Sequence, residues 1–517
     1  MRPMPQPSKR RVSADYDFPA PTGGWRTDVT LSDMPPDAAA IMDNFFPEAN
    51  KIRARRGNAP YATGLGSGSV NTIIAYNGAS LKMFGACGAH IYDITSPGAV
   101  GAAAVSGLTN DYWSYTNFTN SGGKWIRLVN GSDTPLLFDG TTWGTSPAIT
   151  GTGLTTSNLM KVTAYRSRLW FLEKGTTNLW YLGTDAVGGA ANVLNVGNVM
   201  KHGGNLVAIG VWSIPVYTGI NQSLVLVSDQ GEIIVYQGSN PADATNWSLL
   251  GTFKQGRPIG DRCLLNVGGD LAILTQDAIV PLSQAIKLDR GAIDQGSITA
   301  KIAPSWSDAV ANCGNVVGWS IVAFPQRRMA IVNVPQTDGT VQFVMNTTTG
   351  AWCRFTNIPA FCWETWNDGL YWGGARGTVL KAETGSLDNA AAIDCLAVGA
   401  FRRMKGGLPQ KQARILSLSL FLGPNSNAFA GISVDYKTAV PTATVAGVPR
   451  PVALWDVALW DIALWPGDVN IRRLVSSGAV GIAFAPTIRA LISGDNSTTS
   501  ACDLIGGSIA YEAGAPV

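Results

Sequence analysis

The middle of the chain, from about residue 70 to 383, is a succession of short apolar or alternating runs. Each run has the length and composition of a strand. Between them stand pairs that tolerate the positive φ of tight hairpin turns; these are Asn77-Gly78, Asn130-Gly131, Asp139-Gly140, Asp338-Gly339 and Asp368-Gly369. The runs are 71–76, 81–84, 125–129, 136–138, 168–172, 179–182, 224–227, 233–236, 271–274 and 329–334. We therefore predict a long all-β region.

A loose unit recurs within this region: a strand, a polar turn, a second strand, and a turn with an aromatic residue nearby. About six such units follow one another, and repeated short-strand units that cannot bury their faces alone are typical of a β-propeller. They lie near 71–96, 112–143, 159–183, 205–250, 263–300 and 318–381. The prediction is a β-propeller of about six irregular blades. A pair of β-sandwiches would give similar local patterns and stays open as the alternative.

The N-terminal part has a different pattern. Residues 1–18 are rich in Pro, Ser and charge, which favours an extended arm that becomes ordered on a partner. In SDMPPDAAAIMDNFFPEAN, Ser32 and Asp33 precede two prolines, a start signal for a helix. The apolar residues that follow have helical spacing; they are Met34, Ala38, Ile41, Met42 and Phe45. We predict one short amphipathic helix that ends at Pro47.

Beyond residue 384 the composition shifts to Ala, Val and Gly with further strand-like runs. We predict a second, platform domain built from 19–70 and 384–517, next to a propeller of 71–383. Within it, LWDVALWDIALWPGD repeats every five residues, so Trp455, Trp460 and Trp465 cannot all lie on one face of a strand or helix. We expect at least one of them to contact another element or another chain. A loop packed under its own domain is the alternative.

Composition and charge narrow the function classes. Charged residues make up 14% of the chain against a usual ~25%, and 46% hydrophobic residues supply a core. A net charge of +3 is too small for a protein that grips DNA tightly. Seven scattered cysteines without C-x-x-C spacing, and two histidines, fit neither a zinc site nor a disulfide framework, which favours synthesis in a reducing cytoplasm. Without an apolar run after the first residues, or one of membrane-spanning length, we expect neither secretion nor stable membrane insertion.

Candidate chemistry is sparse. The glutamates are few and far apart, and most aspartates stand beside turn residues. Carboxylates from distant loops could converge for glycoside hydrolysis, but the repeated Asp-box of sialidases is not in the sequence. His90 and His202 lie in no nucleophile or metal motif, and the glycines of 64–68 lack the lysine and helix of a phosphate loop. We therefore predict no catalytic, cofactor-binding or metal-binding residues, and no enzyme.

A family resemblance rests on residues 23–57, GGWRTDVTLSDMPPDAAAIMDNFFPEANKIRARRG. The shared elements are Gly24-Trp25, an Asp/Met-Pro stretch leading to Ala39 and Ala40, the block 42–47 (MDNFFP), and Arg55-Arg56-Gly57. This segment resembles the N-terminal signature of tail proteins from short-tailed bacteriophages and their prophages. It covers under a tenth of the chain.

The resemblance implies a tail tube, nozzle or hub subunit: a β-propeller plus a platform, assembled as a six-fold homo-oligomeric ring below the head-to-tail adaptor. Such a structural virion protein, made late in the host cytoplasm, retains genomic dsDNA, passes it without sequence-specific binding during ejection, and carries tail fibre or spike proteins. Near-neutral charge suits a conduit, because a strongly basic lumen would slow DNA exit. Candidate residues for subunit or partner contact are Trp25, Met42, Asp43, Asn44, Phe45, Phe46, Arg55, Arg56, Trp455, Trp460 and Trp465.

Two other functions stay open at this point. One is a carbohydrate-binding tail fibre or adhesin, expected to be trimeric, with exposed aromatic residues near Asp or Asn on one propeller face. The other is a propeller-type glycan hydrolase, which an activity assay on host polysaccharide would reveal.

Overall fold

The computed structural model describes residues 13–216, 219–288, 290–337, 339–405, 410–423, 426–441, 469–493 and 502–513. The chain forms two compact units. Unit 1 comprises residues 1–59, 344–356 and 383–517, and unit 2 comprises residues 60–343 and 357–382. The predicted boundaries lay at 70/71 and 383/384; the chain passes between the units at 59/60, 343/344, 356/357 and 382/383.

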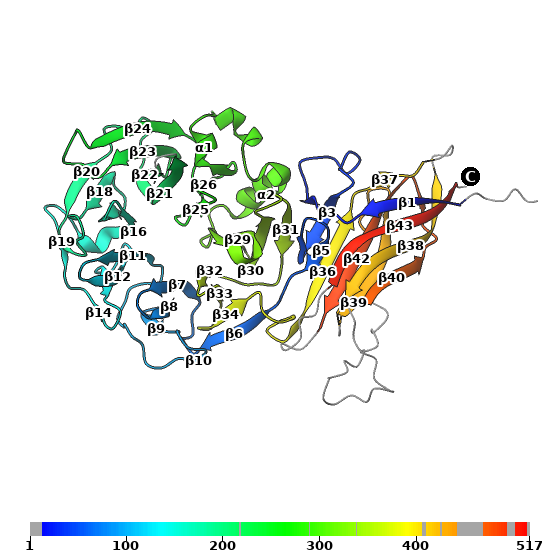
Figure 1. Ribbon diagram of the computed structural model, residues 1–517, viewed down its shortest axis with the longest axis horizontal. Helices are drawn as coiled ribbons and strands as arrows, with labels where there is room; N and C mark the ends of the chain where they lie inside the picture. The colour runs from blue at the N-terminus through cyan, green and yellow to red at the C-terminus, as the bar shows by residue number, and fades with distance from the viewer. Residues whose placement is uncertain are drawn as a thin grey trace, which may run out of the picture. The chain divides into compact units, whose positions relative to one another are not determined.

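Unit 2 is a β-propeller, in which small antiparallel sheets surround a common axis (Figure 1). Among its described residues we number the sheets as blades 1 to 7 in chain order. Blade 1 consists of β7 (Val70–Asn77), β8 (Leu81–Cys87) and β9 (His90–Asp93), and blade 2 of β11 (Ser114–Asn120), β12 (Gly123–Val129), β13 (Leu136–Phe138) and β14 (Trp143–Gly144). Blade 3 consists of β16 (Leu159–Tyr165), β17 (Arg168–Glu173), β18 (Asn178–Tyr181) and β20 (Asn192–Asn195). Blade 4 consists of β21 (Leu206–Val216), β22 (Gly219–Ser228), β23 (Glu232–Gly238) and β24 (Trp247–Lys254). Blade 5 consists of β25 (Leu264–Val267), β26 (Asp270–Leu274) and β27 (Ile279–Pro281). Blade 6 consists of β28 (Ser320–Phe324), β29 (Met329–Gln336) and β30 (Gly339–Asn346), and blade 7 of β32 (Cys362–Trp366), β33 (Gly369–Gly373) and β34 (Val379–Ala382).

The ring of blades is closed. The first strands are neighbours in the order β7, β11, β16, β21, β25, β28, β32 and back to β7. In addition β6 (Asn58–Thr63), from the start of the unit, pairs with β34 at its end, so blade 7 combines both ends of the propeller. Apolar clusters seal neighbouring blades; Ile74 and Phe84 of blade 1, for example, pack with Ile126 and Phe138 of blade 2. The β-propeller prediction is thereby confirmed.

The blade count differs from the prediction of about six. The segment 318–381, predicted as one unit, forms two three-stranded antiparallel sheet segments, β28–β29–β30 and β32–β33–β34, which stand at opposite ends of one strand order. The chain leaves unit 2 at residue 344 and returns at 357 between these sheets, and this passage hides the boundary in the sequence. Every strand-length run of the first pattern lies in a strand, with Leu182 alone falling one residue past β18.

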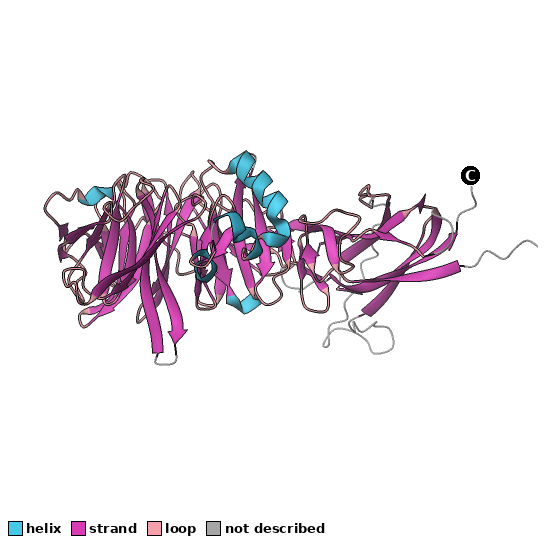
Figure 2. Cartoon of the chain, turned by 90° about the horizontal axis from the view of Figure 1, so that it is seen from above, coloured by secondary structure: helices cyan, strands magenta, loops and turns pink. Residues whose placement is uncertain are grey.

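Helices form only a small part of the described chain (Figure 2). They are α1 (Leu282–Ala285), α2 (Ala303–Cys313) and the 3-10 turns Thr156–Asn158, Arg290–Gln295, Ala300–Ile302 and Pro325–Arg327. Short strands outside the blades are β10 (Gly98–Ala99), β15 (Ile149–Thr150) and β19 (Gly189–Ala190). The protein is therefore all-β in class, as predicted.

Unit 1 contains two sheets. Sheet A has the order β1 (Ser13–Pro19), β43 (Cys502–Ala513), β38 (Lys411–Leu422), β40 (Val469–Ser476), with β41 (Val480–Gly481) on β38 and the hairpin β4 (Phe45–Pro47), β5 (Ile52–Ala54) on β43. Sheet B has the order β31 (Trp352–Phe355), β3 (Ala38–Asp43), β36 (Ala391–Gly399), β42 (Ala483–Ile492), β39 (Ser426–Val434), with β2 (Gly24–Trp25) on β3, β35 (Leu387–Asp388) on β36 and β37 (Arg402–Arg403) on β42. Side chains of both sheets meet between them.

The predicted helix at 32–47 is wrong. Residues 38–43 form β3 and residues 45–47 form β4, separated by Asn44, whose φ is +57°. A left-handed residue breaks a helix, and Asn tolerates this conformation better than most residues. β3 pairs on both sides, with β2 and with β36, and the apolar residues that suggested one helical face are divided among the segment before β3 (Met34), β3 itself (Ala38, Ile41 and Met42) and β4 (Phe45).

The predicted N-terminal arm is in part a strand. Residues 13–19 form β1, which pairs antiparallel with β43 along its whole length. The first 12 residues lie outside the described part of the chain.

Candidate functional site

The segment of the family resemblance builds a buried polar network in unit 1. Asn44 is fully buried, and its Nδ2 donates to Thr356 Oγ1 and to the Asp394 carbonyl, each at 2.8 Å. Arg55, 3% exposed, donates from Nε to Asn44 Oδ1 at 2.8 Å. The other end of the same guanidinium forms an ion pair with Asp388, with Nη1 2.8 Å from Oδ1. One asparagine and one arginine therefore tie together three chain segments that are far apart in sequence.

A second ion pair lies beside this network. Arg354 binds Asp43 through two parallel hydrogen bonds of 2.7 and 2.9 Å, and its guanidinium lies 5.0 Å from the Trp25 ring. Paired hydrogen bonds of this kind fix geometry as well as charge. They connect β3 with β31, the strand that reaches unit 1 from the middle of the sequence.

Most predicted contact residues are interior residues of unit 1. Trp25, Met42, Asn44, Phe45, Phe46 and Arg55 are all buried. Within this chain their side chains stabilise unit 1 and do not form a surface for partners, because their contacts are already made inside it. Arg56 is exposed and Asp43 is half-buried, so a partner role stays a prediction for these two. Trp455, Trp460 and Trp465 lie outside the described residues.

The basic cluster around residue 53 is also paired inside unit 1. Lys51 and Arg53 both bind Asp503, with Lys51 Nζ 2.7 Å from Oδ2 and Arg53 Nε 2.8 Å from Oδ1. Burial alone would raise the pKa of the Asp503 carboxyl, but the hydrogen bonds from these two cations outweigh it and hold the pKa below its ordinary value. This cluster is therefore not a free basic patch.

The larger candidate site is a cavity of about 600 Å³ on the propeller axis of unit 2. Every first strand of the seven described blades contributes to its wall or adjoins it. The lining residues are Thr72, Ile73, Trp113, Ser114, Tyr115, Lys161, Ala208, Ile209, Asp261, Arg262, Leu264, Leu265, Asn266, Ser320, Ile321, Val322, Ala323, Trp363, Glu364 and Thr365. Four of them carry ionisable charges, unusual for the interior of a unit this apolar.

Asp261 and Arg262 link three other blades to blade 5. Lys161 Nζ on β16 lies 2.6 Å from Asp261 Oδ2. Arg262 donates from Nη1 to the Asn71 carbonyl at 2.9 Å and from Nη2 to Thr72 Oγ1 at 2.8 Å, both on β7. Its guanidinium also lies 3.9 Å from the ring of Tyr112, just before β11. The cations of the cavity are thus held in place by the blades.

Glu364 on β32 is the second carboxylate of the cavity. Its Oε2 accepts a hydrogen bond from the Tyr115 hydroxyl at 2.8 Å, and its Oε1 accepts one from the Thr365 backbone at 3.0 Å. Desolvation by the surrounding wall raises the pKa of Glu364 from 4.5 to about 7, against the opposing effects of Tyr115, Thr365 and Arg262. Its carboxyl is therefore partly protonated near neutral pH.

The two carboxylates differ in electrostatic environment. Burial would raise the pKa of Asp261, but Lys161 first, and then Arg262, lower it, and the net pKa lies below the ordinary value. Asp261 is consequently ionised, whereas Glu364 changes charge near neutrality. Sequence reasoning missed both, because Asp261 lies just before blade 5 and Glu364 lies on blade 7, and the two reach one cavity only when the ring closes. A faint signal was available for Glu364, a lone acid in the apolar run CWETW.

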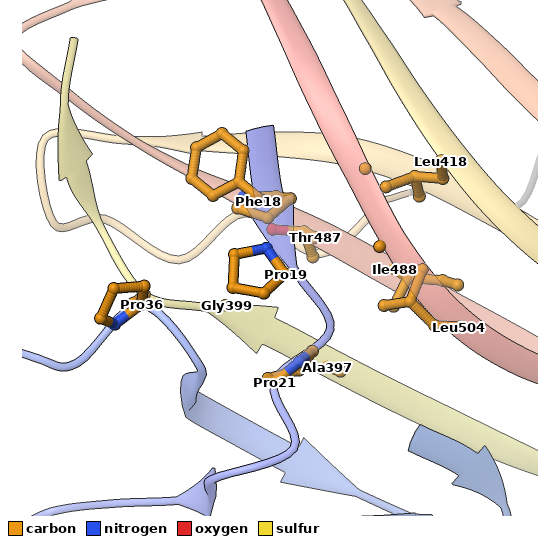
Figure 3. A pocket seen from close by; sticks show the side chains of 14 residues that line it. Phe18, Pro19, Pro21, Pro36, Ala397, Gly399, Leu418, Thr487, Ile488 and Leu504 are labelled. Carbon is orange, nitrogen blue, oxygen red and sulfur yellow. The ribbon is translucent and has the colours of Figure 1, made fainter. Parts of the chain in front are cut away.

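A second, much smaller cavity of about 20 Å³ lies between the sheets of unit 1 (Figure 3). Apolar side chains surround it, among them Phe18 and Leu504 from sheet A and Ile488 from sheet B. This space is about that of one water molecule and its lining offers few polar partners, so it is a packing gap.

The cysteines of the described chain are unpaired thiols in the protein interior. All seven cysteines are buried free thiols, and burial raises the pKa of Cys263, Cys362 and Cys502 to about 12. Among the described residues, no group of three or more His, Cys, Asp or Glu side chains is placed to hold a metal ion. The described helices include none that is both long and apolar enough to cross a membrane.

Comparisons with known proteins give similarity of fold only. No family model matches the sequence, and no curated protein does. Among solved structures, the chain is similar to YCF48 from Cyanidioschyzon merolae, with 10% identity, a TM-score of 0.36, and coverage of 64% of this chain and 98% of that chain. It is also similar to BBS1N, crystallised in complex with ARL6DN, with 11% identity, a TM-score of 0.39, and coverage of 65% and 98%.

Proposed function

We propose that this protein is a structural subunit of the tail nozzle of a short-tailed bacteriophage, a ring below the head-to-tail adaptor that retains genomic dsDNA and then passes it. The observation that carries the proposal is the family-like segment 23–57. Its Asp43, Asn44 and Arg55 are the residues that bind distant segments of unit 1 together. The residues that carry the resemblance are thus the ones that hold unit 1 together, and the same chain carries the β-propeller that the resemblance implies.

Unit 1 also has a face suited to contact between copies. Ile415 on β38 is 43% exposed and Leu474 on β40 is 64% exposed. Ile415 pairs with Ser476 and Ser417 with Leu474, so the two apolar side chains are diagonal neighbours on one face of sheet A. Val480, 53% exposed, follows on β41. We name Ile415, Leu474 and Val480 the sheet A patch. Exposed apolar groups gathered on one face are typical of protein contacts.

Complementation of incomplete particles tests the nozzle directly. In a phage that encodes this chain, deletion of its gene is expected to give filled heads that leak DNA and do not infect. Adding the purified full chain to these heads is expected to restore DNA retention and infectivity, and electron microscopy is expected to show a six-fold ring below the adaptor. Infectious particles without the chain, or the chain found as trimers at fibre tips, would overturn the proposal; the second result would favour the adhesin.

The sheet A patch is tested by a double substitution, Ile415→Asp with Leu474→Asp. This variant is expected to fold, because both side chains are exposed, but to fail to complete the heads. The matched control is Leu250→Asp on β24 of unit 2, where Leu250 is 50% exposed. The control is expected to complement normally. Equal activity of both variants would remove this face from the assembly.

A further inference from the structure

The axial cavity of unit 2 has the size and the construction of a ligand site. Its volume of about 600 Å³ lies within the ~300–1,000 Å³ of typical small-molecule sites. Its wall is rigid, since it consists of first strands that are hydrogen-bonded into their own blades. Asn266, an exposed residue in its lining, marks a side on which the cavity reaches solvent. Propeller blades surround a central channel, and in this one the first strands place charged and hydroxyl side chains along it.

When Glu364 is ionised, the two cations and the two carboxylates of the cavity sum to zero charge. The Lys161 ammonium is paired with Asp261, and Glu364 lies within the electrostatic influence of Arg262. Arg262 itself already donates to the Asn71 carbonyl and to Thr72. A small anion would therefore meet an ammonium that is already paired and a guanidinium that already donates to the protein, and a metal ion would meet carboxylates that are paired or partly protonated. The cavity selects against ions and in favour of a neutral polar ligand.

The remaining hydrogen-bonding capacity is of the kind that hydroxyl groups use. Each carboxylate oxygen of Glu364 accepts one hydrogen bond from the protein and keeps another lone pair. Ser320, 9% exposed, lines the cavity with a hydroxyl that has no partner among the described residues. The lining thus offers both an acceptor and a hydroxyl donor, and a ligand hydroxyl can use either.

The cavity lining also includes an aromatic side chain, Trp363. The Trp363 indole lines the cavity, and its Nε1 donates to Asn333 Oδ1 at 3.1 Å, which fixes the orientation of the ring. A fixed indole offers an apolar surface to the C–H face of a ring-shaped ligand, while charged and amide side chains bind its hydroxyls. We propose that the axial cavity of unit 2 binds a short neutral saccharide. The proposal stands apart from the nozzle proposal, since it concerns a pocket within one chain.

Binding is tested on the purified full chain with a panel of neutral tri- and tetrasaccharides built from glucose, galactose, mannose, rhamnose or N-acetylglucosamine. Saturation-transfer NMR identifies the binders, and calorimetry gives the affinity of the best one. Inorganic phosphate and sialyllactose are the anionic comparisons. At least one neutral saccharide is expected to bind, with neither anion competing. Absence of binding across the panel, or a preference for phosphate, would overturn the proposal.

Three variants locate the binding. Ala323→Trp fills the cavity from β28 without changing charge and is expected to abolish binding. Glu364→Gln is expected to weaken it about tenfold or more, because one of the two acceptor oxygens is replaced by an amide nitrogen that cannot accept a hydrogen bond. The control is Glu173→Gln, which alters a buried carboxylate of unit 2 that binds Trp180 and lies outside the cavity lining. Binding that survives Ala323→Trp in a chain with an unchanged melting temperature would place the saccharide elsewhere.

Discussion

At the scale of single residues, neighbouring positions in one motif have opposite roles. Arg55 and Arg56 are adjacent in the sequence, and both belong to the segment that carries the resemblance. Arg55 is 3% exposed and paired with Asp388, whereas Arg56 is exposed. A sequence pattern shows that both are arginine, but only the fold shows which one is committed to the interior.

Arg55→Ala is expected to destabilise unit 1 by about 3–5 kcal/mol, because it leaves the Asp388 carboxylate and the Asn44 amide without their partner in a buried place. Denaturant-induced unfolding measures the loss. Arg56→Ala is the matched control, with a smaller expected loss because the Arg56 side chain is exposed. Similar losses for both arginines would contradict the assigned network.

Glu364 makes the stability of the folded protein depend on pH, and the direction of that dependence follows from its raised pKa. Its pKa is raised from 4.5 to about 7, so the folded chain holds the proton more tightly than the unfolded chain. The associated stability is present below about pH 4.5 and is lost as pH rises to about 7. Glu364→Gln removes this dependence. Relative to wild type, the variant is expected to gain on the order of 2 kcal/mol between about pH 5 and about pH 8.

Unfolding of both proteins in denaturant at the two pH values provides the measurement. Gln accepts one of the two hydrogen bonds that the carboxylate accepts, which costs a constant amount at both pH values, so the comparison uses only the change with pH. A parallel dependence in wild type and variant would show that Glu364 titrates normally.

At the scale of elements, the strands of unit 2 were predictable and the N-terminal helix was not. Runs such as 168–172 and 179–182 are short and mostly apolar, and turn residues follow each of them. This combination predicts a strand from the local sequence alone. The turn between β32 and β33 has positive φ at Asn367 and Asp368, one residue before the predicted pair Asp368-Gly369, and the predicted pair Asn77-Gly78 has no positive φ. In 32–47 the apolar spacing fits a helix, but pairing of β3 with β2 and β36 decides the outcome, and such partners are invisible locally.

β1 is the element whose contribution is easiest to measure. Phe18, 4% exposed, is the buried side chain through which this edge strand packs beside the small cavity of unit 1. Phe18→Ala is expected to cost about 3–5 kcal/mol, because it removes a buried ring and enlarges an existing gap. Asp17→Ala, on the exposed face of the same strand, is expected to cost about 0.5 kcal/mol or less. Thermal unfolding compares the two, and equal melting temperatures would mean that β1 adds little to unit 1.

At the scale of the whole molecule, the sequence allows the two units to be predicted but not their interleaving or the axial site. The change of composition near 384 lies close to a real boundary of unit 1. The insertion 344–356 has no compositional mark, since Trp352 and Phe355 resemble the aromatic residues of any blade. Lys161, Asp261 and Glu364 belong to three blades, and only ring closure brings them to one cavity. Long-range closure of this kind leaves no periodic pattern in the sequence.

Because residues 344–356 belong to unit 1 although they lie between two parts of unit 2 in the sequence, we expect one double substitution to help a fragment of unit 2 and to destabilise the full chain. Trp352 and Phe355, 1% and 3% exposed, belong to unit 1, where Phe355 lies 5.6 Å from the Arg55 guanidinium. A fragment of residues 60–382 contains all of unit 2 but separates these two side chains from the rest of unit 1. The fragment is expected to aggregate through them, because large apolar groups without cover associate.

Trp352→Ser with Phe355→Ser is therefore expected to make the fragment soluble and monomeric by light scattering. In the full chain the same change is expected to cost at least about 3 kcal/mol, because it removes two buried aromatic side chains from unit 1. A fragment that stays aggregated after the substitution, together with a full chain that keeps its stability, would show that residues 344–356 do not belong to unit 1. The two readouts move in opposite directions only if one short segment of the middle of the sequence completes the core of the other unit.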